Sequence, residues 1–179
     1  MMSFTSFDTS FGRCGISWEG DEVTAFYLPS VHPTPGAASS VSNSDSLQVP
    51  EGDCAAAPEW VQAIIRSVQS HLAGHTEDFS RVTLAWHRVS SFQRAVYKQT
   101  LAIPPGFKRS YGDLAKAMAL GPEASRAVGV ALATNPWPLL VPCHRVVSAS
   151  DKMTGFSGPG GIRTKTRLLV LEGAELLSE

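Results

Sequence analysis

The sequence predicts an α+β protein, in which a small N-terminal sheet module with a covering helix precedes a mainly helical, winged-helix-like C-terminal domain. Two observations support this prediction. Over residues 4–29, short apolar runs alternate with glycine-containing turns, which is typical of strands joined by hairpins. Beyond residue 90, apolar side chains recur at helical spacing between polar caps. We therefore expect an N-terminal module over residues 1–86 and a C-terminal domain over residues 87–179.

The N-terminal module is expected to contain two or three strands, a long loop, a helix and a further strand. Residues 29–57 are rich in Pro, Gly, Ser and Ala, which predicts a loop-rich segment. Over residues 58–72, apolar residues return at helical spacing, and Gly74 is placed to end this helix. Residues 82–86 have the composition of one more short strand.

The helices of the C-terminal domain begin at recognisable caps. Ser91 is predicted to cap a helix that ends before Pro104. A second helix begins at Ser110, where Asp113 completes a pattern like a capping box, and it is expected to end at Gly121.

Pro122 is expected to open a third helix, which ends before Asn135. Two short helices on either side of Gly121 fit a helix-turn-helix, and a generic helical hairpin fits nearly as well, so DNA binding stays open on this pattern alone. A terminal helix is predicted over residues 165–177, and it contains Glu172.

The net charge of −1 conceals a strong asymmetry along the chain. Residues 1–85 hold 3 Lys/Arg and 10 Asp/Glu, whereas residues 86–179 hold 12 and 6. The basic half is therefore the part suited to a polyanion such as a nucleic acid. The alternative is that the two oppositely charged surfaces attract each other.

Cysteine and histidine usage argues against disulfides, metals and cofactors. Three widely spaced cysteines are typical of a reducing compartment. No metal site is predicted, because no ligand spacing is recognisable among Cys14, Cys54, His32, His71, His75 and His87. The chain lacks a signal-like start and an apolar run of roughly 18 residues. We expect no membrane association and a cytoplasmic location, or a nuclear one in a eukaryote.

The dipeptide Cys143-His144 is the candidate reactive site. A cysteine is nucleophilic as the thiolate, and a neighbouring histidine is able to take its proton near neutral pH. Glu172 is the candidate carboxylate that would hold the imidazole. The alternative is that Cys143 is an inert buried cysteine, as most cysteines are.

Six short blocks surround this cysteine in a fixed order. They are Ser110-Tyr111-Gly112-Asp113-Leu114-Ala115, Ser125-Arg126-Ala127-Val128-Gly129, Asn135-Pro136, Pro142-Cys143-His144-Arg145-Val146, Gly155-Phe156-Ser157-Gly158 and Leu168-Leu169-Val170-Leu171-Glu172-Gly173. Their ordered combination resembles the O6-alkylguanine-DNA alkyltransferase family over about residues 90–175. The first half resembles the family in layout alone.

The resemblance implies a stoichiometric methylated-DNA-[protein]-cysteine S-methyltransferase. Its acceptor is Cys143, whose sulfur would take the alkyl group from guanine O6 and keep it. The resemblance further implies that His144 is the base, acting through a water, and that Glu172 orients it. It assigns proton donation toward guanine N3 to Tyr111, and bracing of the turns around the site to Asn135.

The implied partner is double-stranded DNA carrying O6-alkylguanine, bound in the minor groove by a monomer with the damaged base flipped out. The resemblance makes Arg126 the residue that fills the vacated space, and the small Ala127 lets the third helix approach the DNA. Tyr111 would also contact the DNA. Charge alone suggests four phosphate neighbours, Arg94, Lys108, Arg109 and Lys116.

The implied substrate pocket is lined by Leu132, Pro138, Val146, Phe156, Ser157 and Gly158. Phe156 stands where the family usually has tyrosine, so the stacking surface stays but the hydroxyl is lost. Ser157 is expected to supply a donor toward O6. The loop that begins at Gly158 is about two residues longer than the family pattern, so the resemblance does not predict the pocket width.

Three alternative functions remain. An alkyltransferase-like protein would bind the lesion without reacting, although such relatives lack the acceptor cysteine. A cysteine hydrolase would use Cys143, His144 and Glu172 as a triad, although it would have no use for Arg126 or a helix-turn-helix. A damage-responsive regulator would carry an upstream cysteine-rich zinc domain, and this sequence shows no such segment.

Overall fold

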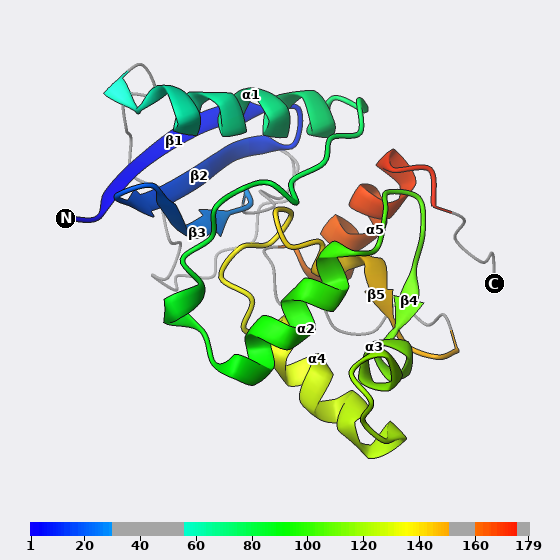
Figure 1. Ribbon diagram of the computed structural model, residues 1–179. Helices are drawn as coiled ribbons and strands as arrows, with labels where there is room; N and C mark the ends of the chain where they lie inside the picture. The colour runs from blue at the N-terminus through cyan, green and yellow to red at the C-terminus, as the bar shows by residue number, and fades with distance from the viewer. Residues whose placement is uncertain (30–55, 151–159, 175–179) are drawn as a thin grey trace, which may run out of the picture.

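The computed structural model describes residues 1–29, 56–150 and 160–174. Within these ranges the chain has the predicted α+β fold, with a three-stranded sheet and a helix first and a mainly helical part after them (Figure 1). The sheet and its helix lie on one side of the molecule, and the other helices lie on the opposite side. Most of the loop-rich segment predicted over residues 29–57 lies outside the described residues.

The antiparallel sheet has the strand order β1 (Ser3–Thr9), β2 (Gly12–Glu19) and β3 (Glu22–Tyr27). Gly12 and Gly20 lie at the two hairpin turns with φ of +119° and +57°, a region that glycine enters without steric cost. Residues 14–18 of the central strand are all buried. The prediction of two or three strands in this stretch is therefore confirmed.

Helix α1 (Glu59–Leu72) lies across the sheet and contacts β1 (Figure 1). Its buried apolar side chains repeat at helical spacing: Val61, Ile65, Val68 and Leu72. Burying a side chain of this size contributes roughly 1.5–3 kcal/mol, so this face holds the helix on the sheet. His71 lies on the same buried side. Gly74, with φ of +102°, follows the helix end as predicted.

The strand predicted over residues 82–86 is wrong. Leu84 forms a single bridge with Val23 of β3. The residue after Leu84 has φ of −72° and ψ of 67°, and the Trp86 N–H bonds back to the Leu84 carbonyl at 2.7 Å. This inverse γ-turn directs the chain away from the sheet edge and into the short helix η2 (Trp86–Arg88).

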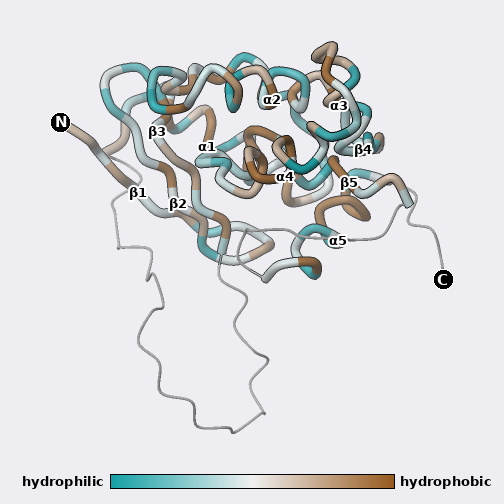
Figure 2. The backbone as a smooth tube through the Cα atoms, turned by 90° about the horizontal axis from the view of Figure 1, so that it is seen from below, coloured by the Kyte–Doolittle hydropathy of each residue, from teal (hydrophilic) through white to brown (hydrophobic). Residues whose placement is uncertain are grey.

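The second half contains α2 (Ser91–Leu101), β4 (Arg109–Ser110), α3 (Tyr111–Ala117), η3 (Pro122–Ala124), α4 (Ser125–Ala133), η4 (Cys143–Arg145), β5 (Val146–Val147) and α5 (Gly161–Leu171). The two short strands β4 and β5 pair in parallel. This pairing brings the start of α3 beside the segment that follows η4. Figure 2 shows α4 as a largely apolar segment in the middle of this half.

Capping boxes start α2 and α3. The cap of α2 is Ser90, one residue before the predicted Ser91, and its hydroxyl accepts the Gln93 N–H at 3.1 Å. Gln93 bonds back to the Ser90 N–H at 2.9 Å, which completes the box. The box predicted for α3 is confirmed, because the Asp113 N–H donates to the Ser110 hydroxyl at 3.0 Å and its carboxylate accepts the Ser110 N–H at 2.9 Å.

Helices α3 and α4 pack closely against each other. A Cβ atom at Gly129 would lie 3.9 Å from the ring of Tyr111, which is ordinary van der Waals contact, so this packing does not require glycine. α3 ends at Ala117 rather than at the predicted Gly121, because Ala119 adopts a left-handed φ of 57° that does not continue a helix. The pair fits both the predicted helix-turn-helix and a helical hairpin.

Helix α5 spans Gly161–Leu171, so it begins before the predicted Lys165 and ends before the predicted residue 177. Glu172 is its C-cap, and Gly173 follows with φ of +77°. The N–H groups of Gly173 and Ala174 bond back to carbonyls of the last turn at 3.0 and 2.9 Å. This Schellman motif places Glu172 at the helix end.

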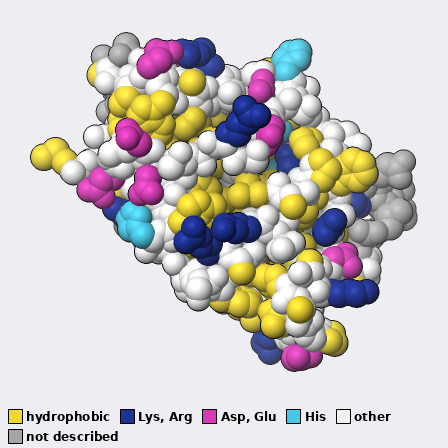
Figure 3. Space-filling view, in the orientation of Figure 1, with side chains coloured by type: hydrophobic (Ala, Val, Ile, Leu, Met, Phe, Trp, Pro, Cys, Tyr) yellow, Lys and Arg dark blue, Asp and Glu magenta, His cyan; other side chains and the backbone are white. Residues whose placement is uncertain are grey.

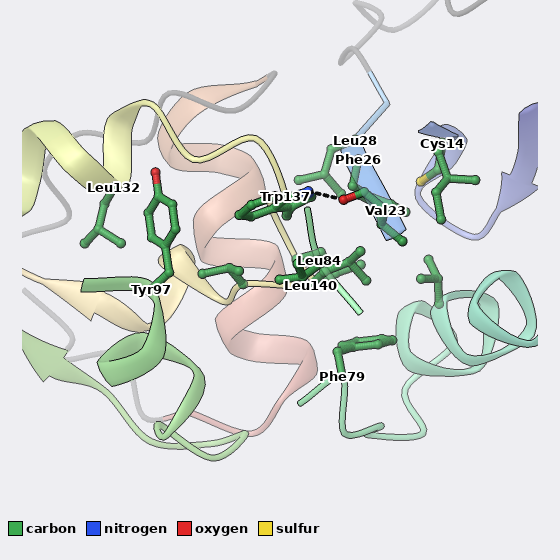
Figure 4. Close-up of a cluster of buried hydrophobic side chains, with 14 of the residues drawn as sticks. Cys14, Val23, Phe26, Leu28, Phe79, Leu84, Tyr97, Leu132, Trp137 and Leu140 are labelled. Carbon is green, nitrogen blue, oxygen red and sulfur yellow. Dashed lines mark hydrogen bonds between the residues drawn. The ribbon is translucent and has the colours of Figure 1, made fainter. Parts of the chain in front are cut away.

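A continuous hydrophobic core joins the sheet to the helical half (Figure 4). The fully buried Trp137 lies between them, and its Nε1–H donates to the Val23 carbonyl of β3 at 2.9 Å. The Trp137 ring meets Tyr97 of α2 edge-on, with 6.1 Å between centroids. The Phe26 N–H of β3 donates to the Pro136 carbonyl at 2.9 Å. The sheet therefore holds the loop that leads to η4.

None of the helices in the described ranges has the length and apolar character needed to cross a bilayer.

Candidate active site

The loop between α4 and η4 is tied together by the side chain of Asn135. Its Nδ2 donates to the Val141 carbonyl at 3.1 Å, and its Oδ1 accepts the Trp137 N–H at 3.0 Å. Leu139, inside this loop, has a φ of 75°. Such a conformation costs a non-glycine residue about 1 kcal/mol or more, so the surrounding contacts must hold it in place. Asn135 thus fixes the segment directly before Cys143.

Cys143 opens η4 and is partly buried. Burial raises the pKa of its thiol above the ordinary value of 9.0, while the Asn135 side chain and the positive charge of Lys165 act in the opposite direction. At neutral pH the resting thiol is therefore protonated. A base is needed to generate the thiolate.

His144 is fully buried beside it, and its Nε2 lies 2.9 Å from Oε1 of Glu172. Burial lowers the pKa of His144 below 6.5, although the Glu172 carboxylate opposes this shift. An ionised carboxylate only accepts hydrogen bonds, so Nε2 is the protonated nitrogen. Nδ1 then keeps a lone pair, and it has no hydrogen-bond partner among the described residues.

Glu172 is held by three side chains. Arg145 forms a fork, with Nε donating to Oε2 at 2.9 Å and Nη2 to Oε1 at 2.8 Å. His144 and His71 each place Nε2 at 2.9 Å from Oε1. Burial by itself would raise the pKa of Glu172, but these hydrogen bonds outweigh it and hold the pKa well below 4.5. The buried carboxylate is therefore ionised.

Tyr111 is the first residue of α3 and is partly buried. Burial raises the pKa of its phenol above 10.0, and the negative charge of an ionised Cys143 raises it further. The phenol is therefore within electrostatic reach of Cys143. It stays protonated at neutral pH and is available as a donor.

Three charged or polar residues of the site were not predicted from the sequence: His71, Arg145 and Lys165. Lys165 is buried and donates to the Val146 carbonyl at 2.6 Å. The one signal for His71 was its position on the apolar face of a predicted helix, where an unpaired polar group is costly. Arg145 directly follows the Cys-His pair, and no pattern marked it separately.

The predicted pocket residues have mixed environments. Leu132 and Val146 are buried in the core, and Leu132 points toward the same cluster as Tyr97 in Figure 4. Pro138 is partly buried. Phe156, Ser157 and Gly158 lie outside the described residues. A cavity of about 420 Å³ is lined in part by Pro142 and Arg145, and Cys143 is not among its lining residues.

The predicted DNA-contacting side chains lie mostly on the surface of the helical half. Those that are exposed are Arg126 and Ala127 on α4, Lys116 on α3, Arg109 on β4 and Arg94 on α2. Lys108 is partly buried. The Arg94 guanidinium also lies over the ring of Trp86, 5.7 Å from its centroid. Figure 3 shows Lys and Arg side chains spread over the helical side of the visible face, and acidic side chains gathered near the sheet.

Among the described residues, no group of three or more His, Cys, Asp or Glu side chains is arranged to hold a metal ion. Cys14 is buried in the sheet, and burial raises the pKa of its thiol to about 12. Cys54 and His32 lie outside the described residues.

Residues 91–174 match the family model described as 6-O-methylguanine DNA methyltransferase, DNA binding domain. The chain is 40% identical over 116 residues to a methylated-DNA–protein-cysteine methyltransferase of Methanosarcina acetivorans, which covers 65% of this chain and 71% of that protein. It is 49% identical over 115 residues to a protein of the same name from Mycobacterium bovis, which covers 64% of this chain and 67% of that protein.

The fold is similar to the crystal structure of Mycobacterium tuberculosis OGT in complex with DNA. The TM-score is 0.71 at 30% sequence identity, and the match covers 94% of this chain and 92% of that one. Sequence and structure agree over the segment that contains the Cys143 site. The chain therefore belongs to the methylated-DNA–protein-cysteine methyltransferase family of enzymes.

Proposed function

We propose that the chain is a single-turnover DNA repair protein that moves the alkyl group of O6-alkylguanine in DNA to Sγ of its own Cys143. One observation supports this most strongly. The buried, ionised Glu172 accepts a hydrogen bond from Nε2 of His144 at 2.9 Å, so Nδ1 of His144 keeps its lone pair and has no partner among the described residues. His144 directly follows Cys143, whose protonated thiol needs a base.

In the first step, Nδ1 of His144 takes the thiol proton through one water molecule. The resulting imidazolium is stabilised by the Glu172 carboxylate, and the thiolate by the Asn135 side chain and the Lys165 charge. Because His144 is neutral at rest, it is ready to accept this proton.

In the second step, a lone pair of Sγ forms a bond to the alkyl carbon, and the bond from that carbon to O6 breaks. The electron pair passes to the guanine, and Tyr111 donates its phenolic proton to N3. The imidazolium of His144 returns the thiol proton to the phenolate through solvent, which closes the proton count. The product is a thioether, and its formation ends the activity of the molecule.

The target base has to leave the duplex, at a cost of a few kcal/mol, because the thiol does not reach it inside the stack. We propose that α4 lies in the minor groove, with Ala127 at close approach and Arg126 in the space left by the base. Lys108, Arg109, Lys116 and Arg94 are the proposed phosphate neighbours.

Arg126→Ala is expected to reduce transfer from duplex DNA at least about ten-fold, because the flipped state loses the side chain that replaces the base. Transfer from free O6-methylguanine is expected to stay within about two-fold. Single-turnover rates on both substrates measure this. Lys98→Ala, which removes an exposed cation of α2, is the matched control. Equal losses on both substrates would contradict the role of Arg126.

The transfer rate is expected to decline on acidification with a midpoint below pH 6.5. Burial lowers the pKa of His144 from 6.5 and raises that of Cys143 from 9.0, so the midpoints of both titrations lie outside the range between these values. Below pH 6.5 the rate falls as His144 becomes protonated and no longer accepts the thiol proton. Single-turnover rates over a pH series test this, and a decline centred above pH 6.5 would contradict it.

Transfer measured with a molar excess of methylated duplex tests the proposed function as a whole. We expect a plateau at one methyl group per protein molecule. Continued turnover would indicate a hydrolase, and binding without transfer would indicate a lesion-binding protein.

We further propose that the protein acts as a monomer in the cytoplasm, or in the nucleus of a eukaryote. The functional division between residues 1–86 and 87–179 is part of the same proposal. It is supported by the charge asymmetry between the two parts.

A further inference from the structure

The Glu172 carboxylate forms a hydrogen bond with a histidine of the N-terminal module. His71, in the last turn of α1, places Nε2 at 2.9 Å from Oε1 of Glu172, although the two residues are 101 positions apart. Both side chains are fully buried. The proposed mechanism so far gives this histidine no task, and a buried polar contact of this length requires an explanation.

Hydrogen bonding fixes the tautomer of His71. The backbone N–H of Glu77 donates to Nδ1 at 3.0 Å, so Nδ1 is an acceptor. Nε2 of the neutral ring therefore carries the proton and donates it to Glu172. The ring is also held by Phe79, at 5.3 Å between centroids. His71 is a fixed donor aimed at one carboxylate oxygen.

We propose that His71 is a positioning residue for alkyl transfer, which fixes Glu172 from the N-terminal module and thereby keeps His144 in the neutral form with Nδ1 free. This inference rests on the proposed function of Cys143 and His144.

The geometry explains how His71 acts through Glu172. Oε1 accepts hydrogen bonds from three donors, His71, His144 and Arg145, at 2.8 to 2.9 Å. Each donor stabilises negative charge on this oxygen and so weakens its attraction for an imidazolium. Without His71, Glu172 would favour protonated His144 more strongly. His144 would then be protonated, and unable to act as the base, at a higher pH.

The charged and titratable groups around His71 agree with this role. Glu172, Arg145 and His144 face it from the helical half, and burial and the Arg145 charge lower the pKa of His144. On its own side, the Glu77 carboxylate accepts the Ser70 hydroxyl at 2.9 Å. The α1 helix thus supplies a part of the site that the family match over residues 91–174 does not include.

Two amide substitutions distinguish the hydrogen bond of His71 with Glu172 from its hydrogen bond with the Glu77 N–H. The side chain of His71→Asn reaches the Glu77 N–H but is too short for Glu172, whereas the amide nitrogen of His71→Gln extends to the position of Nε2. We expect His71→Asn to lose about ten-fold in transfer rate at pH 7, with the decline on acidification shifted to higher pH. His71→Gln is expected to stay within about three-fold of the unchanged protein and to keep its pH profile.

Two measurements on each variant test the proposal. One is the single-turnover rate of methyl transfer from duplex DNA over a pH series. The other is the rate at which iodoacetamide modifies Cys143 over the same series, followed by the mass of the peptide that contains Cys143. Ser70→Ala removes the hydrogen bond from the Ser70 hydroxyl to Glu77 in the same turn and leaves the bonds of Glu172 in place. It therefore controls for a general loss of folding stability. Should His71→Asn not fold, His71→Phe keeps the ring packing and replaces it.

A shifted pH profile in His71→Asn, with rescue in His71→Gln, supports the proposal. An unchanged profile in His71→Asn, or equal losses in both variants that follow the melting temperature, would overturn it. The iodoacetamide series separates this question from the proposed function. If the protein transfers no methyl group but Cys143 still shows the His71-dependent shift, the proposed function fails, and what remains is the effect of His71 on deprotonation of Cys143.

Discussion

Glu172→Gln is expected to slow alkyl transfer about 100-fold and to lower the free energy of unfolding by about 3–5 kcal/mol. The buried carboxylate accepts hydrogen bonds from Arg145, His144 and His71. An amide directs N–H groups at some of these donors and leaves the Arg145 charge without its partner. His144 also loses the acceptor that fixes its protonated nitrogen. Chemical denaturation and single-turnover rates measure the two effects.

Glu59→Gln is the matched control for this change. Glu59 pairs with Arg66 on the surface of α1 at 2.7 Å, and exposed pairs of this kind contribute about 0–1 kcal/mol. We therefore expect little change in stability or transfer. A Glu172→Gln protein with the stability and rate of this control would show that the buried network does not support the site.

Cys143→Ala is expected to abolish transfer completely, because no other described thiol is suited to replace it. Cys14 is buried, with a pKa raised to about 12. DNA affinity is expected to stay within about two-fold, since none of the proposed DNA contacts, which lie on α2, α3, α4 and β4 and at Lys108, involves Cys143. Methyl transfer and equilibrium binding to the same methylated duplex measure both properties. A parallel loss of binding would mean that Cys143 is needed for the fold of the loop.

The elements that the sequence predicted well are those whose signal is local. α1 follows from the spacing of Val61, Ile65 and Val68, and α3 from the capping box between Ser110 and Asp113. The strand predicted over residues 82–86 failed because a γ-turn after Leu84 ends the pairing. Composition alone does not reveal such a turn.

The candidate site was predictable where its residues are adjacent or belong to a pattern. Cys143 and His144 are neighbours in sequence, and Glu172 belongs to a block with a recognisable helix end. The structure brings Glu172 to His144, which directly follows Cys143, and the roles of the three residues stay predictions. His71 contacts Glu172 from 101 residues away, through the packing of two modules. No spacing rule predicts such a contact.

The N-terminal module contacts the candidate site at two places. Phe26 and Val23 of β3 form hydrogen bonds with the loop after α4, and His71 of α1 forms one with the Glu172 carboxylate. The N-terminal module thus contacts the loop before Cys143 through β3 and the Glu172 carboxylate through α1.

The most direct test of this account is the mass of the Cys143 peptide after incubation of the protein with a duplex that contains one O6-methylguanine. We predict that this peptide gains one methyl group in place of one hydrogen, and that the guanine is restored in the DNA. An unmodified Cys143 peptide from protein that has repaired the DNA would contradict the account.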